Sequence, residues 1–187
     1  MAIVYQQILS MVYRYVDKIN YKSEYAQRHA LKNFSVNMLN NLNLNEITTE
    51  LLEAVENAIH TTHSSMMIWN EEKHCFTVLK TTVQLRSWDI SFTNDHPVIK
   101  WFNSNTNNEC LSREMMATLP FFKSMWESER RAISDLNIEV IVPIKSRTGL
   151  AGIMLLSQKE NNVPYTLSDF DLLSSLGATC GVAIDNA

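Results

Sequence analysis

Apolar residues recur every three to four positions along the first 40 residues, a spacing that predicts a helix with one continuous seam. The seam holds, in chain order, Tyr5, Ile8, Val12, Tyr15, Ile19, Lys22, Ala26, His29, Asn33 and Val36. Its first five members are apolar, but three later members are polar, so the helix needs a partner surface. Two partners suit the seam about equally: the helix's own domain, or the same helix of a second copy.

A second amphipathic helix is predicted after an Asn-rich turn, with Asn45 as its N-cap and an apolar stripe over residues 47–59. Residues 64–70 and 74–80 then predict two strands joined by a polar turn. Between residues 81 and 136 the pattern is mixed. It indicates a strand within 83–92, a short helix opened by Asp95-His96-Pro97, and a helix around 121–136.

The last third of the chain has the clearest pattern. Two dense apolar runs, 138–144 and 150–158, are joined by a turn that ends at Gly149, which predicts a β-hairpin. Thr166, followed three residues later by Asp169, predicts the capped start of a closing helix. Its predicted apolar face holds Phe170, Leu173, Gly177, Cys180 and Ile184. The order of elements predicts an α+β domain with helices packed against an antiparallel sheet.

Charge divides the chain near residue 40. Of the 187 residues, 16 are Lys or Arg and 20 are Asp or Glu, a net charge of −4. Residues 1–40 hold five basic and two acidic side chains, a balance of +3, so the remainder carries −7. We therefore expect a helical linker or dimerisation segment over 1–40 and a separate domain over 41–187. The acidic balance argues against a nucleic-acid partner.

The remaining composition excludes several other classes. No run approaches the roughly 20 apolar residues that a membrane span requires, so none is predicted. Three widely separated cysteines suit reduced thiols, which favours a cytoplasmic location. His60 and His63 could share a helix face with His74-Cys75 close by, but a metal site needs three or four converging ligands, so surface histidines are the better interpretation and no metal is expected. His96 could ligate haem or, equally well, cap a short helix. No nucleophile elbow or P-loop occurs, and the chain is not expected to be an enzyme.

Four segments together resemble a GAF domain, a small sensory module of signalling proteins, over about residues 40–187. They are LNLNEITTELLEAVENAIHTTHSSMMIWN, HPVIKWF, LNIEVIVPIKSRTGLAGIMLLSQ and YTLSDFDLLSSLGATCGVAIDNA. The most diagnostic features are Pro143 and Gly152 in the hairpin, and Tyr165 with Asp169 at the start of the closing helix. The N-terminal segment resembles the helix that joins such modules to their neighbours in bacterial sensor kinases and cyclic-di-GMP enzymes.

The resemblance implies an antiparallel sheet of five or six strands. The N- and C-terminal helices would cover one face, and loops and short helices would form a pocket on the other. Family members that bind cyclic nucleotides carry Asn-Lys, then Phe, then Asp-Glu. This chain has Gln158-Lys159, Tyr165 and Asp169-Phe170 there, so that ligand is disfavoured. Bilin-binding members have a Cys followed by His, whereas Leu follows Cys110, so no covalent chromophore is expected and the cofactor stays unknown.

Two sets of residues are candidates for function. The predicted ligand pocket comprises Trp88, His96, Trp101, Phe102, Cys110, Phe122, Trp126, Glu139 and Ile141. Core packing explains the aromatic members equally well, and Glu139 lies either at a pocket wall beside a cation or at the exposed start of its strand. The predicted dimer interface comprises Tyr5, Ile8, Val12, Tyr15, Ile19, Ala26, Val36, Cys180 and Ile184.

These features favour a non-enzymatic module that senses a small molecule and dimerises within a bacterial signal-transduction protein. It would pass its signal through the terminal helices to an output domain outside this chain, such as a histidine kinase or diguanylate cyclase. The alternative is a structural dimerisation or linker module whose pocket is filled by its own side chains. An enzyme of the methionine-sulfoxide reductase type, which shares the fold, would need a reactive cysteine array that three scattered cysteines do not provide.

Overall fold

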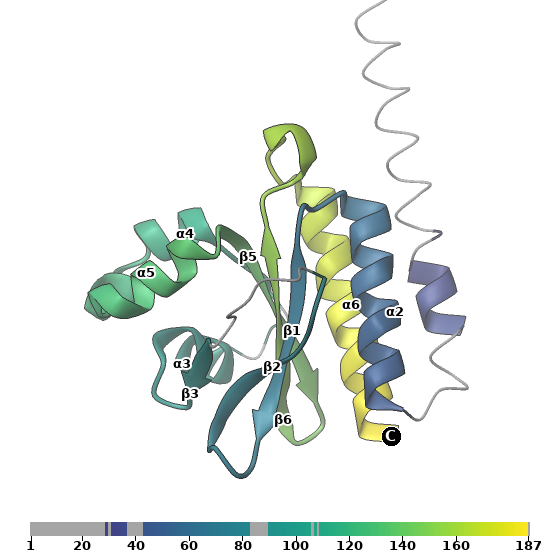
Figure 1. Ribbon diagram of the computed structural model, residues 1–187, viewed down its shortest axis with the longest axis horizontal. Coiled ribbons are helices and arrows are strands. Elements are labelled where there is room, and N and C mark those ends of the chain that lie inside the picture. The colour runs from purple at the N-terminus through teal and green to yellow at the C-terminus, as the bar shows by residue number, and fades with distance from the viewer. Residues whose placement is uncertain are drawn as a thin grey trace, which may run out of the picture.

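The computed structural model describes residues 29, 31–36, 43–82, 90–105, 107 and 109–186. These residues form three layers (Figure 1). Two long helices, α2 (Leu44–Ile59) and α6 (Leu167–Asn186), lie side by side on one face of a sheet. Short helices cover part of the other face, so the sheet is enclosed between a helix pair and a lid.

The sheet has six strands in the order β3-β2-β1-β6-β5-β4, and every neighbouring pair is antiparallel. The strands are β1 (Ser64–Asn70), β2 (Cys75–Thr81), β3 (Ser91–Thr93), β4 (Leu111–Ser112), β5 (Ile138–Ser146) and β6 (Gly149–Ser157). The predicted α+β class and the five- or six-stranded antiparallel sheet are thereby confirmed. The predicted hairpin is β5–β6, which forms the centre of the sheet together with β1.

Helix α2 begins two residues earlier than its sequence pattern indicates. The N-cap is Asn43, whose side-chain oxygen accepts a hydrogen bond from the backbone N–H of Asn45 at 3.0 Å. Either Asn can cap a helix, so the Asn-rich turn alone does not fix the first residue. The helix ends at His60, which adopts the left-handed conformation with φ of 57°. Its buried face packs against α6 and the sheet, and comprises Ile47, Thr48, Leu51, Leu52, Val55, Ala58 and Ile59.

Helix α6 packs very closely against β5. Its capping box forms as predicted, because Asp169 accepts from the backbone N–H of Thr166 at 2.7 Å and donates its own N–H to the Thr166 hydroxyl at 3.2 Å. A Cβ added at Gly181 would lie 1.9 Å from the carbonyl oxygen of Lys145, and one at Gly177 would lie 2.7 Å from that of Pro143. The two glycines therefore allow the helix backbone to approach the strand backbone directly.

Length and composition alone make α6 apolar enough to cross a membrane, and it is the one such helix among the described residues. The mean hydropathy of its 18-residue window is 1.2, and 44% of that window is buried within the fold. The buried side chains contact the sheet and α2. Packing as a core helix therefore accounts for the apolar character of α6.

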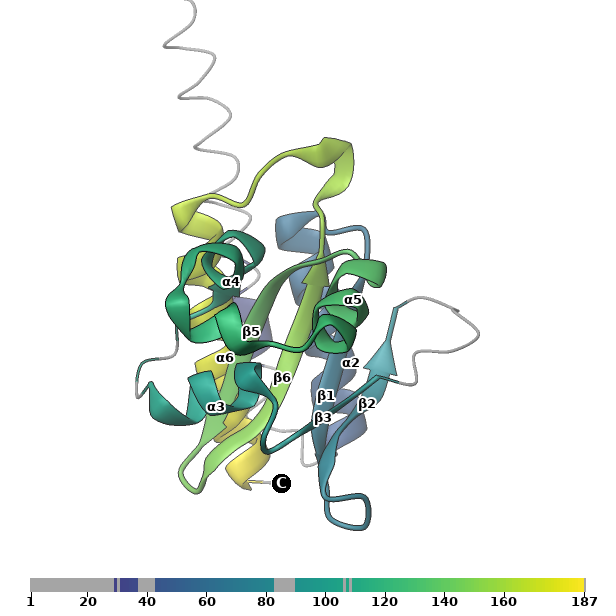
Figure 2. The same cartoon turned by 90° about the vertical axis from the view of Figure 1, so that its left-hand side faces the viewer.

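The lid connects β3 to β5 and contains four short helices (Figure 2). They are α3 (Pro97–Ser104), α4 (Arg113–Thr118), η1 (Pro120–Ser124) and α5 (Glu127–Asp135). The helix predicted around 121–136 is in fact two, because Met125 and Trp126 adopt extended backbone angles between η1 and α5. Helix α4 was not predicted. Its six residues are too few to show an apolar period, although Ser112 caps it by accepting from Met115 N–H at 3.1 Å.

Two apolar clusters lie on opposite faces of the sheet. On β5, Val140, Val142 and Ile144 face the helix pair, whereas Ile138 and Ile141 face the lid. Simple alternation would place Ile138 with Val140, but a β-bulge at Glu139 interrupts the pairing with β6. Phe34 belongs to the first predicted segment, and its side chain is buried in the apolar cluster between the sheet and the helix pair.

Candidate functional site

His96 is a buried histidine at the start of the lid. It caps α3, because its Nδ1 accepts the backbone N–H of Val98 at 3.2 Å. Its ring stacks on Phe92, with ring centroids 4.1 Å apart and planes within 9° of parallel, and only 5% of the residue is exposed. Burial lowers the pKa of His96 to about 4, although nearby Glu129 acts in the opposite direction, so the ring is neutral at pH 7.

The hydrogen bonds of His96 fix its tautomer. A neutral imidazole whose Nδ1 accepts a hydrogen bond must carry its proton on Nε2. That Nε2 atom is buried and has no hydrogen-bond partner among the residues that the structure describes. A buried donor without an acceptor costs about 1–3 kcal/mol, so this group favours any molecule that brings an acceptor to it.

Five of the predicted pocket residues lie together on the lid side of the sheet: His96, Trp101, Phe102, Phe122 and Ile141. Phe102, Phe122 and Ile141 are at most 1% exposed. Trp101 is half-buried and meets the rings of Phe121 and Phe122 at centroid distances of 5.4 Å and 5.5 Å. The walls around this part of the lid are therefore aromatic and aliphatic.

Of the other predicted pocket residues, Cys110, Trp126 and Glu139 lie elsewhere. Cys110 faces the helix pair: its Sγ lies 3.4 Å from the Ser174 hydroxyl and 3.8 Å from the carbonyl of Phe170 on α6. It follows a loop and precedes an edge strand of only two residues, so strand alternation gave no guide to its direction. Trp126 is 76% exposed at the N-cap of α5. Trp88 lies outside the described residues.

Glu139 lies at the bulge of β5, away from the lid cluster. Its carboxylate pairs with Nη1 of Arg113 at 3.1 Å, and 33% of its side chain is exposed. Both residues line a polar pocket of about 370 Å³, together with Lys159, Asn162 and Tyr165. The sequence indicated that a partly buried Glu139 would need a cation but did not identify Arg113, which lies 26 positions earlier along the chain.

The three residues that match the cyclic-nucleotide motif form one contact group between β6 and α6. Lys159 Nζ lies 2.8 Å from Asp169 Oδ2 and 5.7 Å from the centroid of the Tyr165 ring. The Tyr165 hydroxyl donates to the carbonyl of Ser157 at 2.6 Å. These contacts hold the end of β6 to the start of α6, and this group lies outside the lid cluster.

The predicted dimer interface is only partly described. Tyr5, Ile8, Val12, Tyr15, Ile19 and Ala26 lie outside the described residues. Val36 is 54% exposed and Ile184 is half-buried, so both are open to a partner. Cys180 is fully buried against the sheet, because the same face of α6 that carries Leu173 and Leu176 packs on β5. The structure therefore corrects the prediction that Cys180 contacts a second chain. Val182, which is 61% exposed, lies on the side of α6 that faces solvent.

Two of the histidines considered for a metal site lie where the backbone turns. His60 ends α2 and His74 lies in the β1–β2 turn, both with positive φ, at 57° and 52°. His60, His63 and His74 are exposed, whereas Cys75 is buried. Within the described ranges, no three His, Cys, Asp or Glu side chains are grouped closely enough to hold a metal ion.

The layers described above define an α+β domain with a six-stranded antiparallel sheet between paired terminal helices and a helical lid. Comparison with solved structures identifies this arrangement as the GAF-domain fold. The GAF domain of a phosphoenolpyruvate-protein phosphotransferase from Coxiella burnetii superposes with a TM-score of 0.64 at 12% identity, covering 88% of this chain and 95% of that one.

Two further structures place the same fold in other settings. A methyl-accepting chemotaxis protein matches with a TM-score of 0.61 at 13% identity, covering 81% of this chain and 94% of that one. Free methionine-R-sulfoxide reductase from Neisseria meningitidis, in complex with its substrate, matches with a TM-score of 0.61 at 8% identity. The match covers 86% of this chain and 89% of that one. No family model and no curated protein sequence matches the chain.

Proposed function

We propose that this chain is the small-molecule-sensing and dimerisation module of a bacterial signal-transduction protein, without catalytic activity of its own. The observation that carries the proposal is the buried Nε2–H of His96 beneath the lid of a GAF fold. The output domain, a histidine kinase or diguanylate cyclase, would lie outside these 187 residues. Similar folds in a chemotaxis protein and a phosphotransferase support a signalling role.

The chemistry around His96 selects the class of ligand. The Nε2–H calls for a carbonyl, carboxylate or ring-nitrogen acceptor, while the half-buried Trp101 of the same lid-side cluster offers aromatic surface. A flat or largely apolar molecule with one such acceptor satisfies both conditions. The reductase of the same fold holds its substrate, which supports the use of this architecture for small molecules.

Strand β5 offers a route from the lid to the terminal helices. On one side, Lys145 Nζ donates to the carbonyl oxygens of Asn105 and, at 2.9 Å, Asn107, just after α3. On the other side, the backbone of the same strand contacts Gly177 and Gly181 of α6. A shift of the lid therefore reaches α6 through one rigid element. The ligand must bind one arrangement of α6 more tightly than another, since equal affinities shift nothing.

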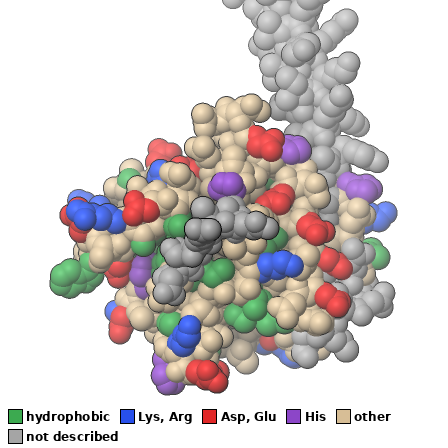
Figure 3. Space-filling view, viewed as in Figure 1, with side chains coloured by type: hydrophobic (Ala, Val, Ile, Leu, Met, Phe, Trp, Pro, Cys, Tyr) green, Lys and Arg blue, Asp and Glu red, His purple; other side chains and the backbone are tan. Residues whose placement is uncertain are grey.

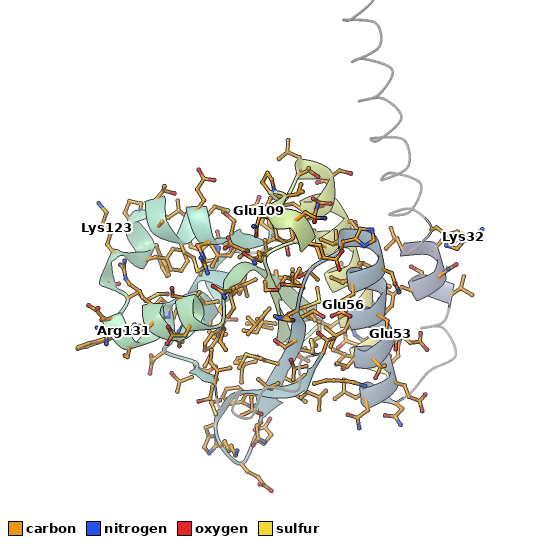
Figure 4. The ribbon with its side chains drawn as sticks, turned by 45° about the horizontal axis from the view of Figure 1, so that its top comes forward. Lys32, Glu53, Glu56, Glu109, Lys123 and Arg131 are labelled. Carbon is orange, nitrogen blue, oxygen red and sulfur yellow. The ribbon has the colours of Figure 1, made fainter. Side chains whose placement is uncertain are left out.

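Charge supports a dimer formed through the terminal helices. Acidic side chains gather over α2 in Figure 3, and Glu53 and Glu56 extend from it in Figure 4. The first 40 residues carry a balance of +3 and include Lys32, which is exposed. We infer that the exposed side of this basic segment contacts the helix pair of a second copy, while Phe34 packs on its own domain, with Val36 and Ile184 in the contact.

The cysteines support a non-enzymatic role. Burial raises the pKa of Cys110 to about 11 and that of Cys180 to about 12, so both are protonated thiols at pH 7. Cys75 is buried too, and none of the three forms a disulfide. Protonated, separated thiols do not make the reactive array of a reductase. They suit a reducing compartment, and we place the chain in the cytoplasm.

A thermal-shift screen of soluble metabolites tests the sensing proposal, with His96→Asn as the matched variant. Asn keeps the N-cap acceptor for α3 but removes the Nε2–H donor. We expect at least one metabolite to raise the Tm of the wild-type chain by several degrees and that of His96→Asn by much less. An equal rise in both proteins contradicts the assigned site.

A structural dimerisation module is the second candidate, because Phe92, Phe102 and Phe122 are each at most 2% exposed and fill much of the space under the lid. In that case no metabolite stabilises the chain, and filling the site with larger side chains leaves dimerisation intact. A dimer that persists while no metabolite in the screen raises the Tm supports this second function.

A further inference from the structure

A pocket distinct from both the His96 group and the pocket beside Glu139 lies between α4 and α5 on the lid. Its volume is about 230 Å³. Its floor is apolar and formed by Met116, Met125 and Ile133, which are 5–9% exposed, with Ala117 at one side. Arg113, Arg130 and Ser134 complete the lining, so an apolar hollow is bordered by two guanidinium groups and one hydroxyl.

Arg130 is held in place by backbone carbonyls. Its Nη2 donates to the carbonyl of Phe122 at 2.9 Å, and its Nε donates to that of Met125 at 3.4 Å. These acceptors are neutral, and Arg130 forms no ion pair with any residue that the structure describes. Its positive charge therefore remains available to an anion in the adjoining pocket.

Arg113 is only partly satisfied by its neighbours. Its Nε donates to the carbonyl of Ile138 at 3.0 Å, and its Nη1 pairs with Glu139 at 3.1 Å. Its Nη2 is buried and lacks a hydrogen-bond partner within the described part of the chain. No acidic side chain among the described residues lines the pocket itself. Glu139 offsets the charge of Arg113 from outside the pocket, so the positive charge at the border comes mainly from Arg130.

We propose that this pocket binds a small amphipathic carboxylate, with its apolar body on the methionines and Ile133 and its carboxylate at the guanidinium border. A guanidinium presents paired N–H donors in a planar fork that matches the two oxygens of a carboxylate. An apolar pocket with a few convergent polar groups is the usual form of a small-molecule site. Because α4 and α5 both line it, an occupant would link two separate helices of the lid.

Octanoate is the probe that tests the site, with 1-octanol as its neutral match of equal chain length. Titration calorimetry on the full chain should show saturable binding of octanoate and binding about tenfold weaker for 1-octanol. Arg130→Gln should weaken octanoate about tenfold, because the amide keeps a donor for the Phe122 carbonyl but loses the charge. Ala117→Leu should also weaken it by filling the apolar part of the pocket.

Matched controls on the same two helices separate the site from general effects. Arg131, labelled in Figure 4, is exposed on α5, pairs with Glu127 and does not line the pocket. Arg131→Gln and Thr118→Leu should leave octanoate binding within about twofold. Equal losses in Arg130→Gln and Arg131→Gln, unchanged binding in Ala117→Leu, or equal affinity for 1-octanol each overturn the proposal. His96 does not line this pocket, so His96→Asn should leave octanoate binding unchanged, which makes the test independent of the sensing site.

Discussion

Lys159 Nζ lies 2.8 Å from Asp169 Oδ2, and the two side chains are only 14% and 2% exposed. The same carboxylate oxygen accepts the backbone N–H of Thr166 at 2.7 Å. One acidic group thus caps α6 and binds the cation that follows β6. This geometry makes the Lys and Asp of the motif a structural connection between the sheet and the closing helix.

The first prediction concerns this ion pair. Asp169→Asn keeps a cap acceptor but leaves the buried Lys159 ammonium without its carboxylate, and should lower the free energy of unfolding by about 3 kcal/mol. Urea unfolding measures the change. Arg131→Gln breaks the exposed pair with Glu127 and should cost less than about 1 kcal/mol. Similar costs for the two variants would show that burial of the Lys159–Asp169 pair is unimportant.

The second prediction concerns the contact of α6 with β5. Gly181→Ala places a Cβ 1.9 Å from the Lys145 carbonyl oxygen and should destabilise the chain by about 3 kcal/mol, because backbone must move. In an open helix the same change would stabilise by about 1 kcal/mol. Ser175→Ala, on the exposed side of α6, serves as the control. A stable Gly181→Ala variant in urea unfolding would contradict the close packing.

The third prediction is a loss of stability in acid that depends on His96. The folded chain protonates His96 only near pH 4, whereas the unfolded chain does so near 6.5. Between these two pH values the unfolded state binds a proton that the folded state does not. The free energy of unfolding therefore falls by about 3 kcal/mol in total as the pH drops from about 6.5 to 4. Urea unfolding at several pH values measures the slope. His96→Asn should remove this part of it, and an identical slope in both proteins refutes the burial argument.

Local sequence signals predicted the parts of the fold that depend on neighbouring residues. The hairpin β5–β6, the capping box of Thr166 and Asp169, and the opening of α3 at His96-Pro97 were each visible from a few adjacent residues. The order of these elements predicted the α+β class with helices against an antiparallel sheet, and the resemblance to GAF domains implied its five or six strands. Patterns of this kind work because strand alternation and helix caps are local properties.

The candidate site was less predictable because it depends on tertiary contacts. The bulge at Glu139 turns the Ile138 side chain to the lid side of the sheet, where simple alternation would place it on the helix side. No residue type in that strand predicts the bulge. Cys110 follows a loop, so the sequence could not show that it faces α6. Arg113 and Arg130 meet at one pocket from two separate helices, an arrangement that only the folded chain reveals.

The fourth prediction concerns self-association. Light scattering should give the mass of a dimer for residues 1–187, and that of a monomer for 41–187. Because we attribute part of the contact to a basic segment beside acidic α2, raising the salt from 0.1 M to 1 M should weaken the dimer, since charges are then screened beyond about 3 Å. A monomer for the full chain at high micromolar concentration would remove the basis of the dimer.

Spin-label distance measurement tests the central claim most directly, that occupancy beneath the lid alters the geometry of the terminal helices. Val182→Cys offers an exposed label on α6, while the three native cysteines are buried. Adding the metabolite identified by thermal shift should move the label-to-label distance across the dimer, and should leave it unchanged in Val182→Cys with His96→Asn. An identical distance distribution with and without a bound metabolite would contradict the account.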